Sequence, residues 1–269
     1  MTNIAELADR GVITLAGGDR VAFLQGLVSN DVAMAAPGRA VFAALLTPQG
    51  RWLADFFVFS DDERLFLEGA AAQLPDLLSK LARYRLRMDV ALTPAAPALR
   101  VYVAWHGAPP PLPAEALFAP DPRHAQAGTR ILSPVSLPTN ASAEDWDAHR
   151  LGLGLPDGPR DLEAGKTLLL EARYDELDAI SWTKGCYMGQ ELTARTRYRG
   201  LVKRRLVAVG VEGPCPPLGA PILAAGACVG EIRTGRDGAA LAWLPNPPPA
   251  GPLLCGAATL TPRTDQPKE

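Results

Sequence analysis

The sequence is poor in the residues that build metal sites and disulfide frameworks. Its 269 residues contain four cysteines, none of them in a CxxC pair: Cys186, Cys215, Cys228 and Cys255. The three histidines, His106, His124 and His149, lack an HExxH or similar spacing. Such spacing indicates neither a zinc site nor a self-contained iron–sulfur site, so no metal ligands are predicted.

Long apolar runs and a charge excess are missing as well. No run reaches the roughly 18 apolar residues of a membrane-spanning helix, and the N-terminus does not resemble a signal peptide. We therefore expect a soluble, cytoplasmic protein with reduced thiols and no membrane partner. The net charge of −2 gives no reason to expect whole-molecule attraction to nucleic acid.

What the chain does have is 48% hydrophobic residues, broken by clusters of proline and glycine. Residues 40–60 read as two strands around a Pro-Gln-Gly turn, which predicts a hairpin. Leucines at helical spacing over 74–81 predict a helix, and Ser142 with Asp145 predicts a capped helix start. After residue 200, short strands separated by turns predict a small antiparallel barrel.

The densest chemical stretch is "KGCYMGQELTARTRYRG", residues 184–200. Gly185 and Gly189 leave room beside Cys186, and Lys184 supplies positive charge that favours a thiolate. A small buried core cysteine is the alternative, because most free cysteines are of that kind. The residues alone leave both interpretations open.

Arginines follow the cysteine at alternate positions. Arg195, Arg197 and Arg199 would share one face if this segment were a strand. Residues 184–205 carry seven basic residues and one acid, Glu191. This pattern is typical of a solvated, ion-paired face, or else of a site for an anion such as a polyglutamate tail, a phosphate or RNA.

Two acids lie within apolar runs, Asp55 in "LADFFVF" and Glu171 in "TLLLEARY". A buried carboxylate is costly unless it is paired, so each should meet a donor. Two such carboxylates suit the donor edge of a pterin, whereas internal pairing with arginine is the alternative.

The 184–200 stretch resembles the KGCYxGQE signature of the YgfZ-type folate-binding proteins. So do "FLQGLVSNDV", "LLTPQGRWLADFFVF", "RYRLRMDV", "LLLEARYDEL" and "VGEIRTG", in the expected order over about residues 12–240. Mitochondrial relatives of that family serve late iron–sulfur cluster assembly. Its wider superfamily is that of the glycine-cleavage T-protein, a tetrahydrofolate-dependent aminomethyltransferase.

The resemblance implies an α+β fold with T-protein-like folate-binding lobes around a central channel, followed by a C-terminal antiparallel β-barrel. The expected boundaries are 1–200 for the folate-binding lobes, 201–263 for the barrel and 264–269 for a tail.

The resemblance also implies a function: a tetrahydrofolate-binding accessory protein for assembly or repair of iron–sulfur enzymes. Cys186 would act as a nucleophile or a transient ligand of an iron–sulfur cluster, with iron–sulfur proteins and assembly factors as partners. The implied folate-binding residues are Asp55, Glu171, Lys184, Gln190, Glu191 and Arg195.

Two alternatives remain, an aminomethyl transferase and a tRNA-modification factor that binds tRNA. Whether the chain turns over a substrate of its own stays open. Ala54 stands where the T-protein carries a second acid, so the resemblance favours folate binding over aminomethyl transfer.

Overall fold

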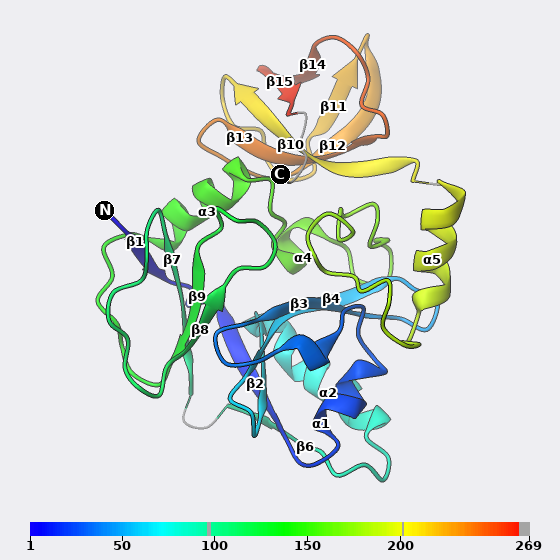
Figure 1. The fold of residues 1–269 in the computed structure, drawn as a ribbon. Helices are drawn as coiled ribbons and strands as arrows, with labels where there is room; N and C mark the ends of the chain where they lie inside the picture. Colours follow the sequence, from blue (N-terminus) through cyan, green and yellow to red (C-terminus); the bar gives the residue numbers. More distant parts are fainter. Residues whose placement is uncertain (96–97, 201, 264–269) are drawn as a thin grey trace.

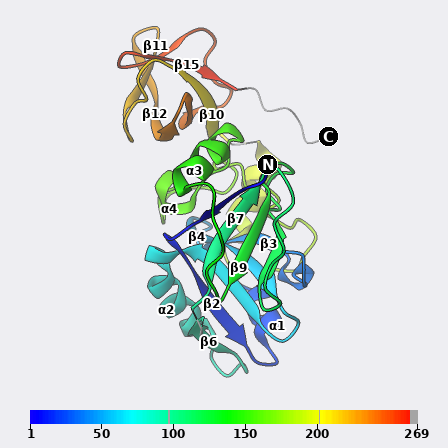
Figure 2. The ribbon, with the colours of Figure 1, turned by 90° about the vertical axis from the view of Figure 1, so that its left-hand side faces the viewer.

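Two antiparallel sheets and a closed barrel form the framework of the chain (Figure 1). The computed structural model describes residues 1–95, 98–200 and 202–263. The barrel lies at one end of the molecule, and helices α3 (Ala143–Gly152) and α4 (Gly158–Asp161) lie between it and the sheets (Figure 2). The predicted class, an α+β body with a C-terminal antiparallel barrel, is confirmed.

The first sheet contains the predicted hairpin. Strands β3 (Val41–Leu46) and β4 (Trp52–Ser60) pair in antiparallel fashion around a turn in which Gly50 takes a φ of +79°. A left-handed residue of this kind is what the Pro-Gln-Gly sequence provides for. The strand order is β3-β4-β5-β2-β6, in which the further strands are β5 (Leu65–Ala70), β2 (Arg10–Ala16) and β6 (Ala91–Pro94).

The two faces of this sheet are buried against different neighbours. Helices α1 (Arg20–Gln25) and α2 (Leu74–Tyr84) pack on one face, where Leu24, Leu77 and Leu81 join a buried cluster. The predicted leucine helix is therefore confirmed as α2, with Pro75 in its first turn. The other face, with Phe42 at its centre, packs toward the second sheet and the barrel.

The second sheet has the order β1-β7-β9-β8 and is built from β1 (Asn3–Glu6), β7 (Arg100–Trp105), β9 (Thr129–Ser133) and β8 (Leu117–Pro120). Helix α3 follows it and begins with the predicted capping box. The Ser142 hydroxyl accepts from the Asp145 backbone N–H, and the Asp145 carboxylate accepts from the Ser142 N–H.

A long irregular segment, residues 162–189, joins α4 to α5 (Gln190–Arg199) without a strand or a regular helix. It is nevertheless well packed, since Leu169, Tyr174 and Ile180 belong to the main buried cluster. Backbone hydrogen bonds fix it to the hairpin, from Trp52 N to Thr167 O at 2.9 Å and from Gly165 N to Trp52 O at 2.8 Å.

Helix α5 decides how the alternating arginines are arranged. Arg195, Arg197 and Arg199 would share one face of a strand, but they lie in a helix between Gly189 and Gly200, both left-handed. Good helix formers fill the segment, and a left-handed glycine commonly ends a helix. Arg195 and Arg199 now share a face, whereas Arg197 points elsewhere and lies over the Trp182 ring at 3.9 Å.

The C-terminal strands close into a barrel in the order β10-β13-β12-β11-β14-β15. Five of the six come from the predicted apolar runs, and the short β14 was not predicted. The predicted tail, 264–269, lies outside the described residues. None of the described helices is long and apolar enough to cross a membrane. The strands are β10 (Arg204–Glu212), β11 (Pro221–Ala224), β12 (Ala227–Arg236), β13 (Ala239–Pro245), β14 (Leu253–Cys255) and β15 (Ala258–Pro262).

Candidate functional site

Cys186 lies in an exposed loop, residues 182–189, which we call the cysteine loop. A Cβ built on the adjacent Gly185 would meet no atom within 4 Å, so this side of the loop faces open space. The thiol is thus accessible, and the core-filling alternative does not apply to it.

Close backbone packing holds the far end of the cysteine loop. Gly189 takes a φ of +80°, and a Cβ there would lie 2.5 Å from the Thr47 carbonyl oxygen and 2.9 Å from Gly50 Cα. A Cβ on Gly50 would in turn lie 2.6 Å from the Gly189 carbonyl oxygen. The two glycines therefore let the loop rest directly on the turn of the β3–β4 hairpin.

Lys184 holds the near end of the cysteine loop. Its ammonium group donates to the carbonyl oxygens of Val28 at 2.8 Å and Asn30 at 2.6 Å, and lies 5.3 Å from the centre of the Tyr187 ring. Burial lowers the pKa of Lys184 to about 8. This side chain therefore ties the cysteine loop to residues 28–30.

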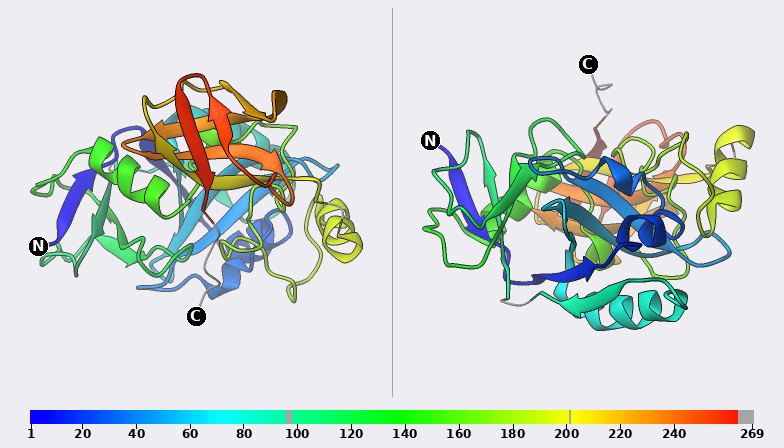
Figure 3. Two further views of the ribbon diagram at one scale, coloured as in Figure 1. Left: turned by 90° about the horizontal axis from the view of Figure 1, so that it is seen from above. Right: turned by 60° about the horizontal axis from the view of Figure 1, so that its bottom comes forward.

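The remaining signature residues belong to helix α5. Gln190 begins the helix, and its side-chain oxygen accepts from the Tyr187 N–H at 3.2 Å. Glu191 and Arg195 form an exposed ion pair at 2.7 Å. The helix stands on the opposite side of the molecule from the N-terminus (Figure 3). Four of the predicted folate-binding residues, Lys184, Gln190, Glu191 and Arg195, thus lie in the cysteine loop or in the helix that follows it.

The other two predicted site residues lie elsewhere. Asp55 is buried, at 5% exposure, and accepts a short hydrogen bond from the Tyr174 hydroxyl. Burial raises the pKa of the Asp55 carboxyl above its usual value. Glu171 pairs with Arg204 at 3.3 Å. Both acids meet donors, as predicted, but they are held by different partners and no contact between the two is present in the described part of the chain.

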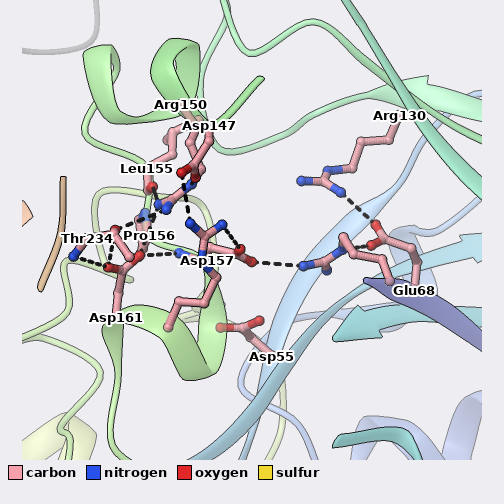
Figure 4. A network of polar contacts seen from close by, with 12 residues as sticks. Asp55, Glu68, Arg130, Asp147, Arg150, Leu155, Pro156, Asp157, Asp161 and Thr234 are labelled. Atoms are coloured by element: carbon pink, nitrogen blue, oxygen red, sulfur yellow. Dashed lines mark hydrogen bonds and ion pairs between the residues drawn. The ribbon is translucent and has the colours of Figure 1, made fainter. Parts of the chain in front are cut away.

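A buried set of ion pairs, which we call the central network, lies where the sheets, α3, α4 and the barrel strand β12 meet (Figure 4). Asp121 and Glu68 each hold two arginines, and Arg150 joins Asp147 to Asp161 at 2.6 and 3.0 Å. The network consists of Arg10, Glu68, Asp121, Arg123, Arg130, Asp147, Arg150, Asp157, Arg160, Asp161 and Arg236.

The central network shifts the acidity of its own members. Burial by itself would raise the pKa of Asp121, but Arg123 and Arg130 lower it well below the usual value. Asp157 behaves alike, because Arg10 and other arginines outweigh its burial. Both carboxylates are therefore ionised in the folded protein over the whole neutral range.

A cavity of about 380 Å³ lies beside the central network. Leu7, Trp146 and Pro156 give it apolar surface, and Arg160 and Arg236, about two-fifths exposed, lie on its solvent side. Neither Asp55 nor Glu171 lines this cavity.

The central network is what sequence reasoning missed. Its residues run from position 10 to 236, and no local motif connects them. The position of Asp55 in an apolar run predicted a donor nearby, but that donor is Tyr174, which lies outside the network. The histidines also converge, with the His106 and His149 rings 4.8 Å apart, yet no group of described residues is arranged to hold a metal ion.

Comparison with known proteins gives the fold and the family. The chain superposes on the glycine cleavage system aminomethyltransferase T from Bartonella henselae with a TM-score of 0.78, at 14% identity, over 99% of this chain and 86% of that one. At this identity the likeness shows the fold alone, and it confirms the predicted T-protein-like architecture. A family model described as "CAF17, C-terminal beta-barrel domain" matches residues 203–266.

Among curated proteins, the human mitochondrial iron–sulfur cluster assembly factor IBA57 is 34% identical over 92% of this chain and 78% of its own length. The IBA57 homologue of Mycosarcoma maydis is also 34% identical, over 80% of this chain and 59% of that protein.

These relatives correct the predicted location. They are mitochondrial proteins by name, so the cytoplasmic prediction is wrong. The cytoplasmic prediction rested on the lack of a long apolar segment. Such a lack argues against a membrane-spanning helix but does not indicate a cellular compartment. The sequence also predicted a YgfZ-type protein, whereas the comparisons establish a related group. The chain belongs to the IBA57 family of iron–sulfur cluster assembly factors.

Proposed function

We propose that this chain acts in iron–sulfur cluster assembly through the thiolate of Cys186. The observation that carries the proposal is an exposed cysteine in a loop that is fixed at both ends, by Lys184 and by the Gly189–Gly50 contact. A fixed, accessible thiol can meet a partner without first reorganising the loop. The relatives of this chain are iron–sulfur cluster assembly factors by name, which supports the same interpretation.

One cysteine cannot hold a cluster alone, because clusters are bound by several ligands, usually four thiolates. No other group on the described residues is arranged as a metal site. The cluster is therefore cargo shared between Cys186 and thiols of a partner, an iron–sulfur protein or another assembly factor.

The cysteine loop and the helix α5 that follows it present a surface that suits such a partner. Trp182 and Tyr198 are exposed, at 38% and 85%, and Arg197 and Arg199 make no ion pair within the described part of the chain. Exposed aromatic residues and arginines are the types that anchor protein interfaces. Positive charge here would attract an acidic partner surface.

We also propose that a reduced folate binds in the cavity beside the central network. The cavity volume is within the range of small-molecule sites, and Trp146, Leu7 and Pro156 offer apolar contact to a flat ring. Arg160 and Arg236 would face the negative tail. Asp55 and Glu171 do not line this cavity, and their carboxylates accept from Tyr174 and Arg204, so their predicted role at the pterin stays a prediction.

The test of Cys186 uses a matched control cysteine. Wild type, Cys186→Ser and Cys228→Ser are incubated anaerobically with ferric iron, sulfide and glutathione as the source of partner thiols. Cys228 is also exposed, but lies in the barrel. Visible absorption and bound iron should persist after desalting in wild type and Cys228→Ser, and be lost in Cys186→Ser. Equal retention by all three proteins rejects the role of Cys186.

The folate part is tested separately, by calorimetric titration of wild type with tetrahydrofolate. Absence of binding heat and of thermal stabilisation would reject it without touching the cysteine proposal. The aminomethyl-transferase alternative, which the shared fold supports, predicts turnover when methylene donors are added to the folate complex.

A further inference from the structure

One guanidinium nitrogen of the central network has no partner. Arg10 uses Nε to bond Glu68 and Nη1 to bond Asp157 at 3.0 Å. Its Nη2 is among the buried side-chain atoms of the described residues that make no hydrogen bond. The Arg10 side chain is 7% exposed. A buried donor left unpaired is costly, so this nitrogen calls for an acceptor.

The free nitrogen belongs to a residue that lines the cavity beside the central network. The other deep arginines there bond carboxylates or carbonyl oxygens. Arg123 uses all three of its nitrogens, on Asp121 and the Pro156 carbonyl oxygen, and Arg130 bonds Asp121 and Glu68 through Nε and Nη1. Arg10 contributes a buried donor without a partner to the lining of the cavity.

The charges of the central network leave room for one more anion. Six guanidiniums are joined by ion pairs to five carboxylates, namely Glu68, Asp121, Asp147, Asp157 and Asp161. Asp55 lies close by, but it is bonded to Tyr174, and burial raises its pKa. Of the acids at the rim, Glu6 is held by Arg100, while Asp9 and Glu144 are exposed.

We propose that this cavity is a carboxylate-binding site in which Nη2 of Arg10 donates to the ligand and supplies its counter-charge. A carboxylate both satisfies the free donor and completes the charge balance, and a guanidinium is the side chain best suited to it. The carboxylate has two possible sources, the glutamyl group of a folate or a small free dicarboxylate. In the first case the inference rests on the folate part of the proposed function.

Three probes separate the sources on wild-type protein: tetrahydrofolate, 6-methyltetrahydropterin, which has the ring but no carboxylate, and succinate. Calorimetry and thermal unfolding measure binding. We expect the pterin to bind about tenfold or more weakly than tetrahydrofolate. Binding of tetrahydrofolate alone assigns the site to folate, and binding of succinate alone assigns it to a free dicarboxylate.

Two outcomes overturn the inference. If the pterin binds as tightly as tetrahydrofolate, the ring and not a carboxylate is recognised, and folate binding survives without this anchor. If neither tetrahydrofolate nor succinate binds, there is no carboxylate site. Both leave the iron retention of Cys186 untouched, so this inference and the cysteine proposal fail independently.

Variants place the ligand in the cavity. Arg10→Lys keeps a positive charge near Glu68 and Asp157 but lacks the third nitrogen, and it should weaken carboxylate binding about tenfold. Should it fail to fold, Arg236→Gln on the solvent side of the cavity should still weaken binding about threefold. Arg64→Gln is the matched control, because it breaks an exposed ion pair, that of Arg64 with Asp61, outside this cavity. Unchanged carboxylate binding in Arg236→Gln and in any folded Arg10→Lys overturns the assignment.

Discussion

The deep arginines of the central network, Arg10, Arg123, Arg130 and Arg150, lie away from water between carboxylates, whereas Arg195 of helix α5 stands in solvent. The Arg130 side chain is 3% exposed and contacts both Glu68 and Asp121, while Arg195 is 54% exposed and contacts Glu191 alone. The same residue type thus serves two purposes. In the centre it fixes the sheets, α3, α4 and the barrel relative to one another, and around Cys186 it remains available to a partner.

The difference follows from what water does to charge. A desolvated guanidinium with a partner removed is left unpaired at high cost, whereas an exposed one is simply hydrated. The deep members of the central network should therefore tolerate almost no substitution, whereas Arg236 at its solvent side should tolerate one. The face around Cys186 should tolerate many and show their effects in association instead.

The largest expected effect is that of Glu68→Gln, which takes the carboxylate charge from Arg10 and Arg130 together. Breaking a buried ion pair costs about 3–5 kcal/mol. Glu191→Gln, which breaks the exposed pair with Arg195, should change the free energy of unfolding by less than about 1 kcal/mol. Urea denaturation of both variants measures the contrast. Similar losses in the two would mean that burial does not separate these regions.

Local sequence patterns predicted many elements of the fold. The hairpin turn at Gly50, the capping box at Ser142 and the apolar runs after residue 200 each contain their own signal within a few residues, and each predicted its element. The exposure of Cys186 could not be decided from its glycine and lysine neighbours, which also fit a small core cysteine, and only the tertiary position of the loop shows it.

The central network could not be predicted, because its members are single charged residues that meet only through the tertiary fold. Arg10 and Asp157 are 147 positions apart, and nothing near either residue specifies the other. The arrangement of the α5 arginines could not be predicted for another reason. Alternation over five residues also places the first and last residue one helical turn apart, so the pattern fits a strand and a helix equally.

The second largest expected effect is a loss of stability of the central network at acid pH. The pKa values of Asp121 and Asp157 in the folded protein lie below those of the unfolded chain. The stability they contribute is therefore fully present above the unfolded-state aspartate pKa of about 3.9 and is lost progressively as the pH falls from there toward the lower folded-state pKa values. Thermal unfolding followed by circular dichroism at pH 7, 5, 4 and 3 should show a steep loss below about pH 4. A melting temperature that is flat across this range would contradict the ionised network.

The smallest expected effect is the difference in the free energy of unfolding between alanine variants of two glycines in the cysteine loop, Gly185 and Gly189. Gly189→Ala forces a side chain into a left-handed position, 2.5 Å from the Thr47 carbonyl oxygen, whereas Gly185→Ala meets no atom within 4 Å. Strain of the first kind costs about 1–3 kcal/mol, and an open surface substitution stays within about 0.5 kcal/mol.

The rate at which Cys186 is alkylated gives a second measurement on these two glycine variants, because it depends on the position of the cysteine loop. Gly189→Ala should lift the cysteine loop from the hairpin turn and change the rate at which iodoacetamide alkylates Cys186, while Gly185→Ala keeps the wild-type rate. Gly185 adjoins Cys186 whereas Gly189 lies three residues beyond it, so steric shielding of the thiol by the added methyl group would slow Gly185→Ala and not Gly189→Ala. An effect confined to Gly189→Ala can arise only from its contact with Thr47 and Gly50, which is the contact that holds Cys186 in place.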